Sequence, residues 1–342
     1  MAKEAIRNTY SKAAQTTDHS LCCSVDYREF FSQSDLAHLP EEVLERNYGC
    51  GVPAELRSLA EGLTVLDLGP GLGRDCFIAA KKVGPSGLVC GLDMNSEMLK
   101  KARAFQAAVA DQLGYDNIQF LSGQFDVKIP LPAETVDVIF SNCVNNLAID
   151  KLTAYREMYR VLKPGKKLSF SDVVSYAPIP ELLRKSEQAW ADCVAGVLSF
   201  QELNALLKET GFHGIQLVTD YLWQNGPQIS ERYFSQKPLS EVHRRSLEQV
   251  RLYSVMVEAI KPVVDPGGDC YFIGQQAMFH GPGTAFHLDD DPDHVFRTGE
   301  TKEVCEKTAS ILKSEPFAGY FTVFEPAGEV EARLCVPGQS CC

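Results

Sequence analysis

"TVLDLGPGLGRD", residues 64–75, decides the fold of this chain. Its first half is an apolar segment with the character of a β-strand, and its second half is a glycine-rich turn. Asp67, Gly69, Gly71 and Gly73 follow the spacing D-x-G-x-G-x-G. Glycines let the main chain turn tightly and let a ligand approach the backbone. The helix that follows would offer free N–H groups to an anion such as a carboxylate. We therefore predict a cofactor-binding loop between a strand and a helix.

Strand-like and helix-like segments alternate after this loop. One helical stretch starts near Asn95 or Ser96 and ends at Gly114, a second ends at Pro164-Gly165, and Ser199 can cap a third. The expected strands are 64–69, 88–93, 117–121, 136–140, 167–173 and 214–220. Alternation of this kind predicts an α/β fold with a doubly wound, mostly parallel, Rossmann-like sheet.

We expect three regions along the chain. Residues 1–55 are helical and loop-like, and residues 56–225 hold the sheet and the cofactor loop. In residues 226–342 the alternating rhythm is lost among Gly/Pro turns, with a short helix near "EVCEKTASILKS". This last region is predicted to be a smaller α+β domain with a Cys-rich tail.

Composition restricts the partners of the protein. The chain has 342 residues and a formal net charge of −12. Phosphates would be repelled by this charge, which argues against nucleic acid or an anionic membrane as a partner. The sequence has no apolar run long enough to cross a membrane, and its start lacks the apolar core of a signal peptide. We expect a cytoplasmic protein.

A second acidic residue supports the cofactor loop. Asp93 ends the next predicted strand, twenty residues after Gly73, where a carboxylate can accept both hydroxyls of a ribose. The loop has the form GxGxG instead of the GxGxxG of nicotinamide-binding proteins, and Asp67 suits a ligand that carries an ammonium group. Together with "LKPGK" before a late strand, this pattern resembles the first motif of class I S-adenosylmethionine-dependent methyltransferases.

That resemblance implies further contacts with the cofactor. Met94 would lie against the adenine, and "SGQFD" (122–126) would supply a second adenine wall, with Phe125 as the apolar contact and Asp126 near the exocyclic amine. The backbone around Asn142 would approach the amino-acid end of S-adenosylmethionine.

The cysteines point to the methyl acceptor. The chain has twelve, none in CxxC spacing. Cys143 lies just past the strand 136–140, at the sheet edge where ligands of open α/β sheets sit. A thiolate is a soft ligand suited to thiophilic centres. Transfer from a sulfonium needs no covalent enzyme intermediate when the acceptor has a lone pair, so a metalloid held by sulfur is a suitable acceptor.

Two other cysteines lie in comparable loops. Cys50 occurs in "NYGCGVP" and Cys193 in "AWADCVAGVLSF". The contexts "YGCG", "SNCVNNL" and "DCVAGVL" together resemble arsenite methyltransferases, and the resemblance covers most of residues 1–325. It implies that Cys50, Cys143 and Cys193 hold trivalent arsenic with its lone pair directed at the sulfonium methyl. It also implies that Cys22 or Cys23 exchanges disulfides with Cys50, with thioredoxin or glutathione as reductant.

Other interpretations stay open. The chain could methylate carbon or oxygen of a small organic metabolite, with its cysteines serving as packing, as we expect for Cys76 and Cys90. It could also be a non-catalytic zinc- or metalloid-binding protein, although tetrahedral zinc would need a fourth ligand. The acidic run 289–293, among regularly spaced histidines, is more typical of a solvated loop than of a metal site. The tail pair Cys341-Cys342 either captures arsenic or is a flexible end.

Overall fold

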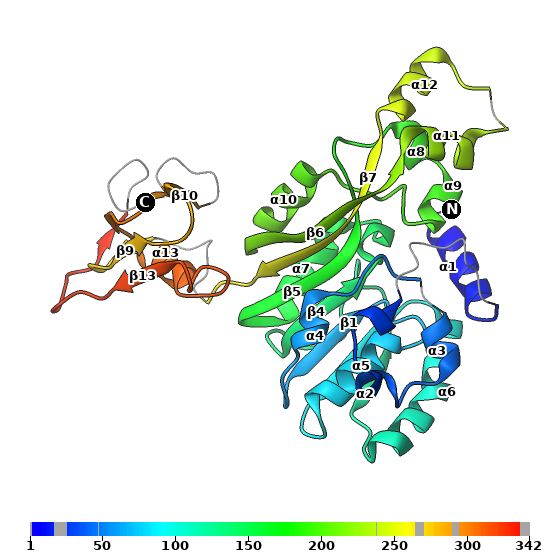
Figure 1. The fold of residues 1–342 in the computed structure, drawn as a ribbon, viewed down its shortest axis with the longest axis horizontal. Coiled ribbons are helices and arrows are strands. Elements are labelled where there is room, and N and C mark those ends of the chain that lie inside the picture. The colour runs from blue at the N-terminus through cyan, green and yellow to red at the C-terminus, as the bar shows by residue number, and fades with distance from the viewer. Residues whose placement is uncertain are drawn as a thin grey trace. The chain divides into compact units, whose positions relative to one another are not determined.

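A seven-stranded sheet forms the core of the larger of two units (Figure 1). Its order is β3-β2-β1-β4-β5-β7-β6, and the pairs from β3 through β5 are parallel. The bounds are β1 Thr64–Leu68, β2 Leu88–Asp93, β3 Ile118–Ser122, β4 Val136–Asn142, β5 Leu162–Ser175, β6 His213–Asn225 and β7 Arg251–Ile260. The doubly wound, mostly parallel architecture predicted from the alternation is confirmed.

The structure is a computed structural model that describes residues 2–16, 26–46, 48–236, 238–263, 270–288 and 294–335. The predictions for Cys22, Cys23, Cys341, Cys342 and the acidic run 289–293 lie outside the described residues. The chain divides into one unit of residues 1–163, 167–210 and 215–259, and a second of residues 164–166, 211–214 and 260–342. This division differs from the expected boundary at residue 226, because β7 joins the large sheet.

Helices cover both faces of the sheet because each carries an apolar stripe. α5 (Arg74–Val83) contacts α6 (Ser96–Leu113) on one side, and α7 (Lys151–Val161) contacts α10 (Phe200–Glu209) on the other (Figure 1). The caps follow the sequence: the Asn95 side chain accepts from the backbone of α6, and Ser199 forms a capping box with α10. The second helix ends at Val161, earlier than expected, because β5 already begins at Leu162.

Further helices complete this unit. They are α1 Ala2–Ala13, η1 Tyr27–Glu29, α2 Gln33–Leu36, α3 Glu41–Glu45, α4 Ala54–Ser58, η2 Asn145–Leu147, α8 Glu181–Arg184, α9 Glu187–Ala191, α11 Gly226–Phe234 and α12 Glu241–Glu248. The helix α1 packs against α9 and α6. Tyr27, Leu36 and Leu56 share one buried cluster with Val65 of β1 and Phe77 of α5, so the N-terminal segment packs onto the sheet domain.

The second unit has a small aromatic core. Phe279, Phe286, Phe296 and Phe321 pack ring to ring. Its elements are β8 Tyr271–Phe272, β9 Gln276–Phe279, β10 Ala285–His287, β11 Val295–Arg297, β12 Thr301–Glu303, α13 Glu306–Leu312, β13 Phe321–Phe324 and β14 Arg333–Leu334. The described part of this unit is therefore α+β.

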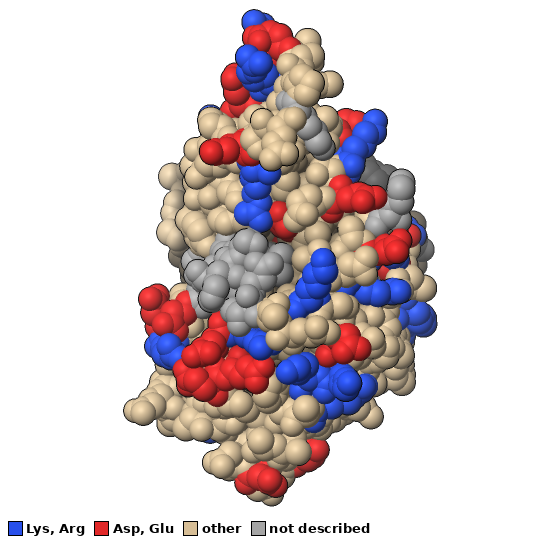
Figure 2. All heavy atoms as spheres, turned by 90° about the vertical axis from the view of Figure 1, so that its right-hand side faces the viewer, with Lys and Arg blue, Asp and Glu red and all other residues tan. Residues whose placement is uncertain are grey.

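No helix among the described residues combines the length and the apolar character that a membrane crossing requires. No group of three or more His, Cys, Asp or Glu residues in the same ranges is arranged to hold a metal ion. On the face drawn in Figure 2, Lys and Arg side chains lie among Asp and Glu side chains.

Candidate active site

A cavity opens at the carboxyl ends of β1, β2 and β4. Nearly all residues that the sequence assigned to cofactor binding line it: Asp67, Gly69, Gly71, Asp93, Met94, Phe125, Asp126 and Asn142. Gly73 does not line the cavity. It is the N-cap of α5 with φ 92°, and a Cβ there would lie 2.8 Å from the ring of Phe77, so this glycine serves the entry into the helix.

Glycine is required at the first two glycine positions of the loop for different structural reasons. A Cβ on Gly69 would lie 2.5 Å from Val144, so the loop after β1 and the loop after β4 touch there. Gly71, with φ 56°, has nothing within 4 Å of its Cβ position, and its main chain faces the cavity. The second glycine thus leaves the backbone accessible to a ligand, as a cofactor loop requires.

Two carboxylates flank this loop, the buried Asp67 and the partly buried Asp93. Asp93 Oδ2 accepts from the Gly71 amide at 3.3 Å and Oδ1 from the Asn95 amide at 2.8 Å, and burial raises the pKa of Asp93 to about 6. Burial and the neighbouring Asp75 raise the pKa of Asp67 well above its usual value. Asp93 is therefore mainly ionised at neutral pH and can accept hydroxyl donors. The lining of the cavity thus offers an acidic group to a ligand that carries hydroxyl donors.

Cys76 has a polar contact that the sequence did not predict. It is buried, as expected of a core residue, but its thiol donates to Asp67 Oδ2 at 3.2 Å. Burial, followed by the Asp67 carboxylate, raises the pKa of this thiol well above its usual value. Cys90 is a buried residue of β2.

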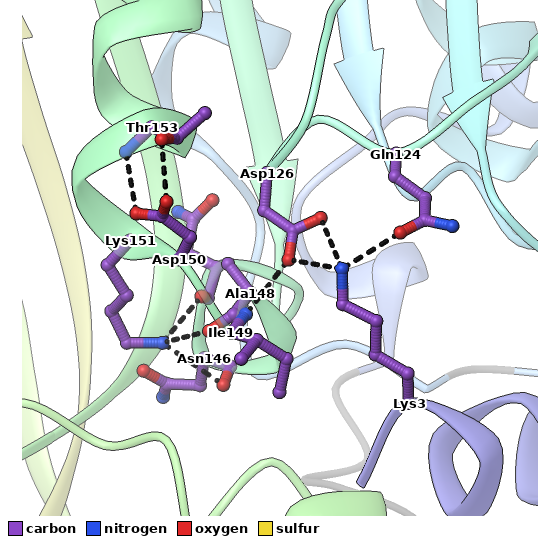
Figure 3. Close-up of polar contacts among 10 residues, drawn as sticks. Lys3, Gln124, Asp126, Asn146, Ala148, Ile149, Asp150, Lys151 and Thr153 are labelled. Carbon is purple, nitrogen blue, oxygen red and sulfur yellow. Dashed lines mark hydrogen bonds and ion pairs between the residues drawn. The ribbon is translucent and has the colours of Figure 1, made fainter.

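Asp126, which also lines the cavity, joins two segments of the chain (Figure 3). Its Oδ2 accepts from the amide of Ile149 at 3.0 Å and pairs with Lys3 Nζ, also at 3.0 Å. Lys3 Nζ donates in addition to Gln124 Oε1 at 2.9 Å. The side chain predicted to face the adenine therefore also anchors α1 and the loop after β4.

Lys151 holds the loop that carries Cys143 (Figure 3). Its ammonium donates to the carbonyls of Asn145, Asn146 and Ala148 at 3.1, 3.2 and 2.9 Å. Burial lowers the pKa of Lys151 to about 8, and the carboxylate of Asp172 offsets part of that effect. A lysine at the first turn of a predicted helix carried no signal in the sequence that could have revealed this role.

The three cysteines predicted to bind arsenic meet beyond the cavity wall. Cys50 and Cys143 form a disulfide, and the Cys193 thiol donates to the Cys143 carbonyl at 3.2 Å. All three are buried in one cluster with apolar side chains such as Val173 and Val197. Cys143 also lines the cavity, so the cysteine cluster adjoins it.

Two of these three cysteines adopt an unusual backbone conformation. Cys143 has φ 60° and Cys193 has φ 61°, a left-handed region that non-glycine residues rarely occupy. Such conformations persist where the surrounding structure imposes them, and they concentrate at functional sites. The two turns aim their side chains into the shared cluster.

Asn142 joins Cys50 to the end of β4. Its Oδ1 accepts from the Cys50 amide at 2.9 Å, and its Nδ2 donates to the Gly51 carbonyl and the Tyr27 hydroxyl, each at 2.8 Å. A Cβ on Gly49 would lie 2.4 Å from this amide, which explains the glycine in "YGCG". The family resemblance predicts a role only for the backbone of Asn142. A polar residue directly before a loop cysteine was the available signal.

This arrangement can present a thiophilic atom to a ligand in the cavity. The disulfide occupies two of the three sulfurs, so a two-electron reduction must precede the binding of any atom by all three. Once reduced, the cluster would offer three soft donors among apolar side chains beside the cavity.

Family models and similar proteins cover most of this chain. A methyltransferase domain model matches residues 59–211, and a domain of unknown function matches residues 266–339. The arsenite methyltransferase of Aquipseudomonas alcaligenes is 34% identical over 326 residues, 93% of this chain and 89% of that protein. The arsenite methyltransferase of Rattus norvegicus is 34% identical over 316 residues, 90% of this chain and 79% of that protein.

One similar crystal structure covers most of the chain. It is an arsenic(III) S-adenosylmethionine methyltransferase from Chlamydomonas reinhardtii, with 32% identity and a TM-score of 0.60. The match spans 87% of this chain and 97% of that structure.

Proposed function

The chain belongs to the arsenite methyltransferase family, and from this premise we propose that it methylates trivalent arsenic with S-adenosylmethionine as the methyl donor. The observation that carries the proposal is the meeting of Cys50, Cys143 and Cys193 in one buried cluster directly beside the cofactor cavity. A methyltransferase for an organic metabolite has no need of three converging thiols at this place.

The cavity residues would hold the methyl donor. We propose that Asp93 accepts from ribose hydroxyls, that Asp67 faces the ammonium end, and that Met94 and Phe125 enclose the adenine with Asp126 at its amine. S-adenosylmethionine supplies a methyl group on a positively charged sulfur. Gly69 and Gly71 would let the main chain approach this ligand, and Cys143, which lines the same cavity, would be the cysteine nearest to it.

The thiols would bind the acceptor. Arsenous acid condenses with three thiols to give an arsenic trithiolate and three molecules of water, without oxidation or reduction. Trivalent arsenic is pyramidal, so three sulfur bonds leave its lone pair free to attack a methyl carbon. Holding both reactants in place accelerates such a transfer by proximity and orientation.

The disulfide of this structure would have to be reduced before arsenic binds. Cys50 and Cys143 must return to thiols before they bind arsenic, and a thiolate of thioredoxin or glutathione can attack the disulfide. We propose that Cys22 or Cys23 relays this exchange to Cys50, and that the protein works in the reducing cytoplasm.

Product speciation tests the proposal. The full chain is incubated with arsenite, S-adenosylmethionine and a thiol reductant, and arsenic species are separated and quantified. We expect methylated arsenicals from the wild type and a loss of at least about 100-fold for Cys143→Ser, as found when a group that orients a reactant is displaced. The matched control Cys90→Ala removes a buried thiol of β2 and should retain turnover.

Each contrary result has a distinct meaning. Unchanged arsenite methylation by Cys143→Ser would reject binding of the acceptor by the Cys143 thiolate. A wild type that neither binds nor methylates arsenite would favour an organic methyl acceptor. Arsenite binding by the wild type without any methylated product would favour a non-catalytic metalloid-binding protein.

A further inference from the structure

One face of α1 borders the cavity. Lys3, Ile6 and Tyr10 are spaced by three and four residues, which places them on the same side of a helix, and all three line the cavity. Ile6 is buried, so this face is packed against the domain. The helix also contacts α9, which ends two residues before Cys193.

The two ends of this face reach different parts of the site. Lys3 Nζ contacts Gln124 and Asp126 at the end assigned to the adenine (Figure 3). Seven residues later, the hydroxyl of Tyr10 lies 3.4 Å from Cys193 Sγ. Seven residues correspond to about 10 Å along a helix. A single rigid element therefore spans the distance from the cofactor end to the thiol cluster.

We propose that Tyr10 is a positioning residue for the third sulfur, and that α1 thereby couples the cofactor cavity to the arsenical-binding thiols. The proposal rests on the proposed function for the identity of the ligand. It assigns to the N-terminal helix a part in catalysis that is separate from the redox role proposed for Cys22 and Cys23.

The chemistry of Cys193 explains why a hydroxyl is useful there. As a thiol, Cys193 donates its proton to the Cys143 carbonyl at 3.2 Å. As a thiolate, or as a sulfur bonded to arsenic, Cys193 has no proton to donate. Its sulfur and the carbonyl oxygen of Cys143 would then both carry partial negative charge and repel each other. A phenol keeps its proton at neutral pH and can donate to the sulfur in either state. Tyr10 would then hold the sulfur in place after its own hydrogen bond to Cys143 is lost.

Tyr10→Phe isolates the hydroxyl because it leaves the ring in the cavity wall. The probe is phenylarsine oxide, a monosubstituted trivalent arsenical that bridges two thiols. It is used on the reduced full-length chain with both vicinal cysteine pairs replaced by serine. We measure its release into excess dithiol, with and without saturating S-adenosylhomocysteine, and the cofactor dissociation constant by calorimetry.

We expect the release rate of Tyr10→Phe to rise about tenfold, the effect of losing one hydrogen bond to a charged or polarisable acceptor. In the wild type, S-adenosylhomocysteine should slow release, and Tyr10→Phe should abolish that slowing while the cofactor dissociation constant stays within about twofold. In turnover, kcat should fall with KM for S-adenosylmethionine unchanged. The control Tyr115→Phe removes a hydroxyl that donates to Ala80 at the same 3.4 Å and should behave as the wild type.

Several outcomes would overturn the inference. Unchanged probe release in Tyr10→Phe, or release that speeds up equally in Tyr115→Phe, rejects a specific role of the hydroxyl. Should Tyr10→Phe fail to fold, Lys3→Gln tests the other end of the same helix: retained coupling between cofactor and probe would reject the bridge, and lost coupling would support it. Absence of methylated arsenic from the wild type defeats the proposed function alone, because probe release is measured without turnover.

Discussion

Replacing Asn142 by alanine separates the two loops that carry Cys50 and Cys143. The side chain makes three close hydrogen bonds, to Cys50 N at 2.9 Å and to the Gly51 carbonyl and Tyr27 hydroxyl at 2.8 Å. A net value of about 1 kcal/mol for each predicts a loss of about 2–3 kcal/mol in the free energy of unfolding. The buried main chain of the Cys50 loop would then lack these partners.

The same change should weaken the Cys50–Cys143 disulfide. The pairing equilibrium depends on how firmly the Cys50 loop is held beside β4, and about 1.4 kcal/mol of lost docking lowers the equilibrium constant about tenfold. We expect at least this decrease when the disulfide is titrated in glutathione redox buffers and the linked peptide is quantified by mass spectrometry. Urea unfolding of the reduced protein measures the change in the free energy of unfolding.

Asn117→Ala is the matched control. Asn117 is also a buried asparagine whose amide donates to two backbone carbonyls, those of Ala80 and Gly84, but it lies outside the cysteine cluster. It should lower stability by a comparable amount and leave the disulfide equilibrium unchanged. If Asn142→Ala matched this control in the redox titration, the idea that Asn142 brings the two cysteines together would be wrong.

Two further predictions concern charged groups of the site. Asp93→Asn keeps the shape of the side chain but removes its charge, so S-adenosylmethionine should bind at least about tenfold more weakly. Because the pKa of Asp93 is about 6, wild-type affinity measured by calorimetry should fall below that pH, and a flat profile down to pH 5 would contradict the assignment. For Lys151, the folded pKa of about 8 lies below the ordinary 10.5, so the unfolded chain binds more protons between these values. Stability of the wild type relative to Lys151→Met should therefore rise with pH across that window. A difference between their denaturation midpoints that does not change with pH would refute the lowered pKa of Lys151.

Local pattern determined the fold of the larger unit. The glycine spacing after β1, the alternation of strands with helices and the caps Asn95 and Ser199 depend on residues a few positions apart, and the structure has all of them. The strand β7 was missed because it follows two short helices in a stretch without a clear alternating pattern. Its pairing with the large sheet moved the boundary from residue 226 to residue 260.

Motif spacing likewise indicated most residues of the cofactor cavity, because the carboxyl ends of parallel strands meet at one edge by the topology of the sheet alone. The convergence of the thiols could be predicted only through family resemblance. Cys50 and Cys143 are 93 residues apart, and Tyr10 reaches Cys193 across 183 residues. The hydrogen bonds of Asn142, the three carbonyls around Lys151 and the bridge formed by α1 arise from side chains that approach one another only when the packed core holds distant loops together. Contacts of that kind leave no periodic or spacing signal in a single sequence, so the tertiary structure alone decided them.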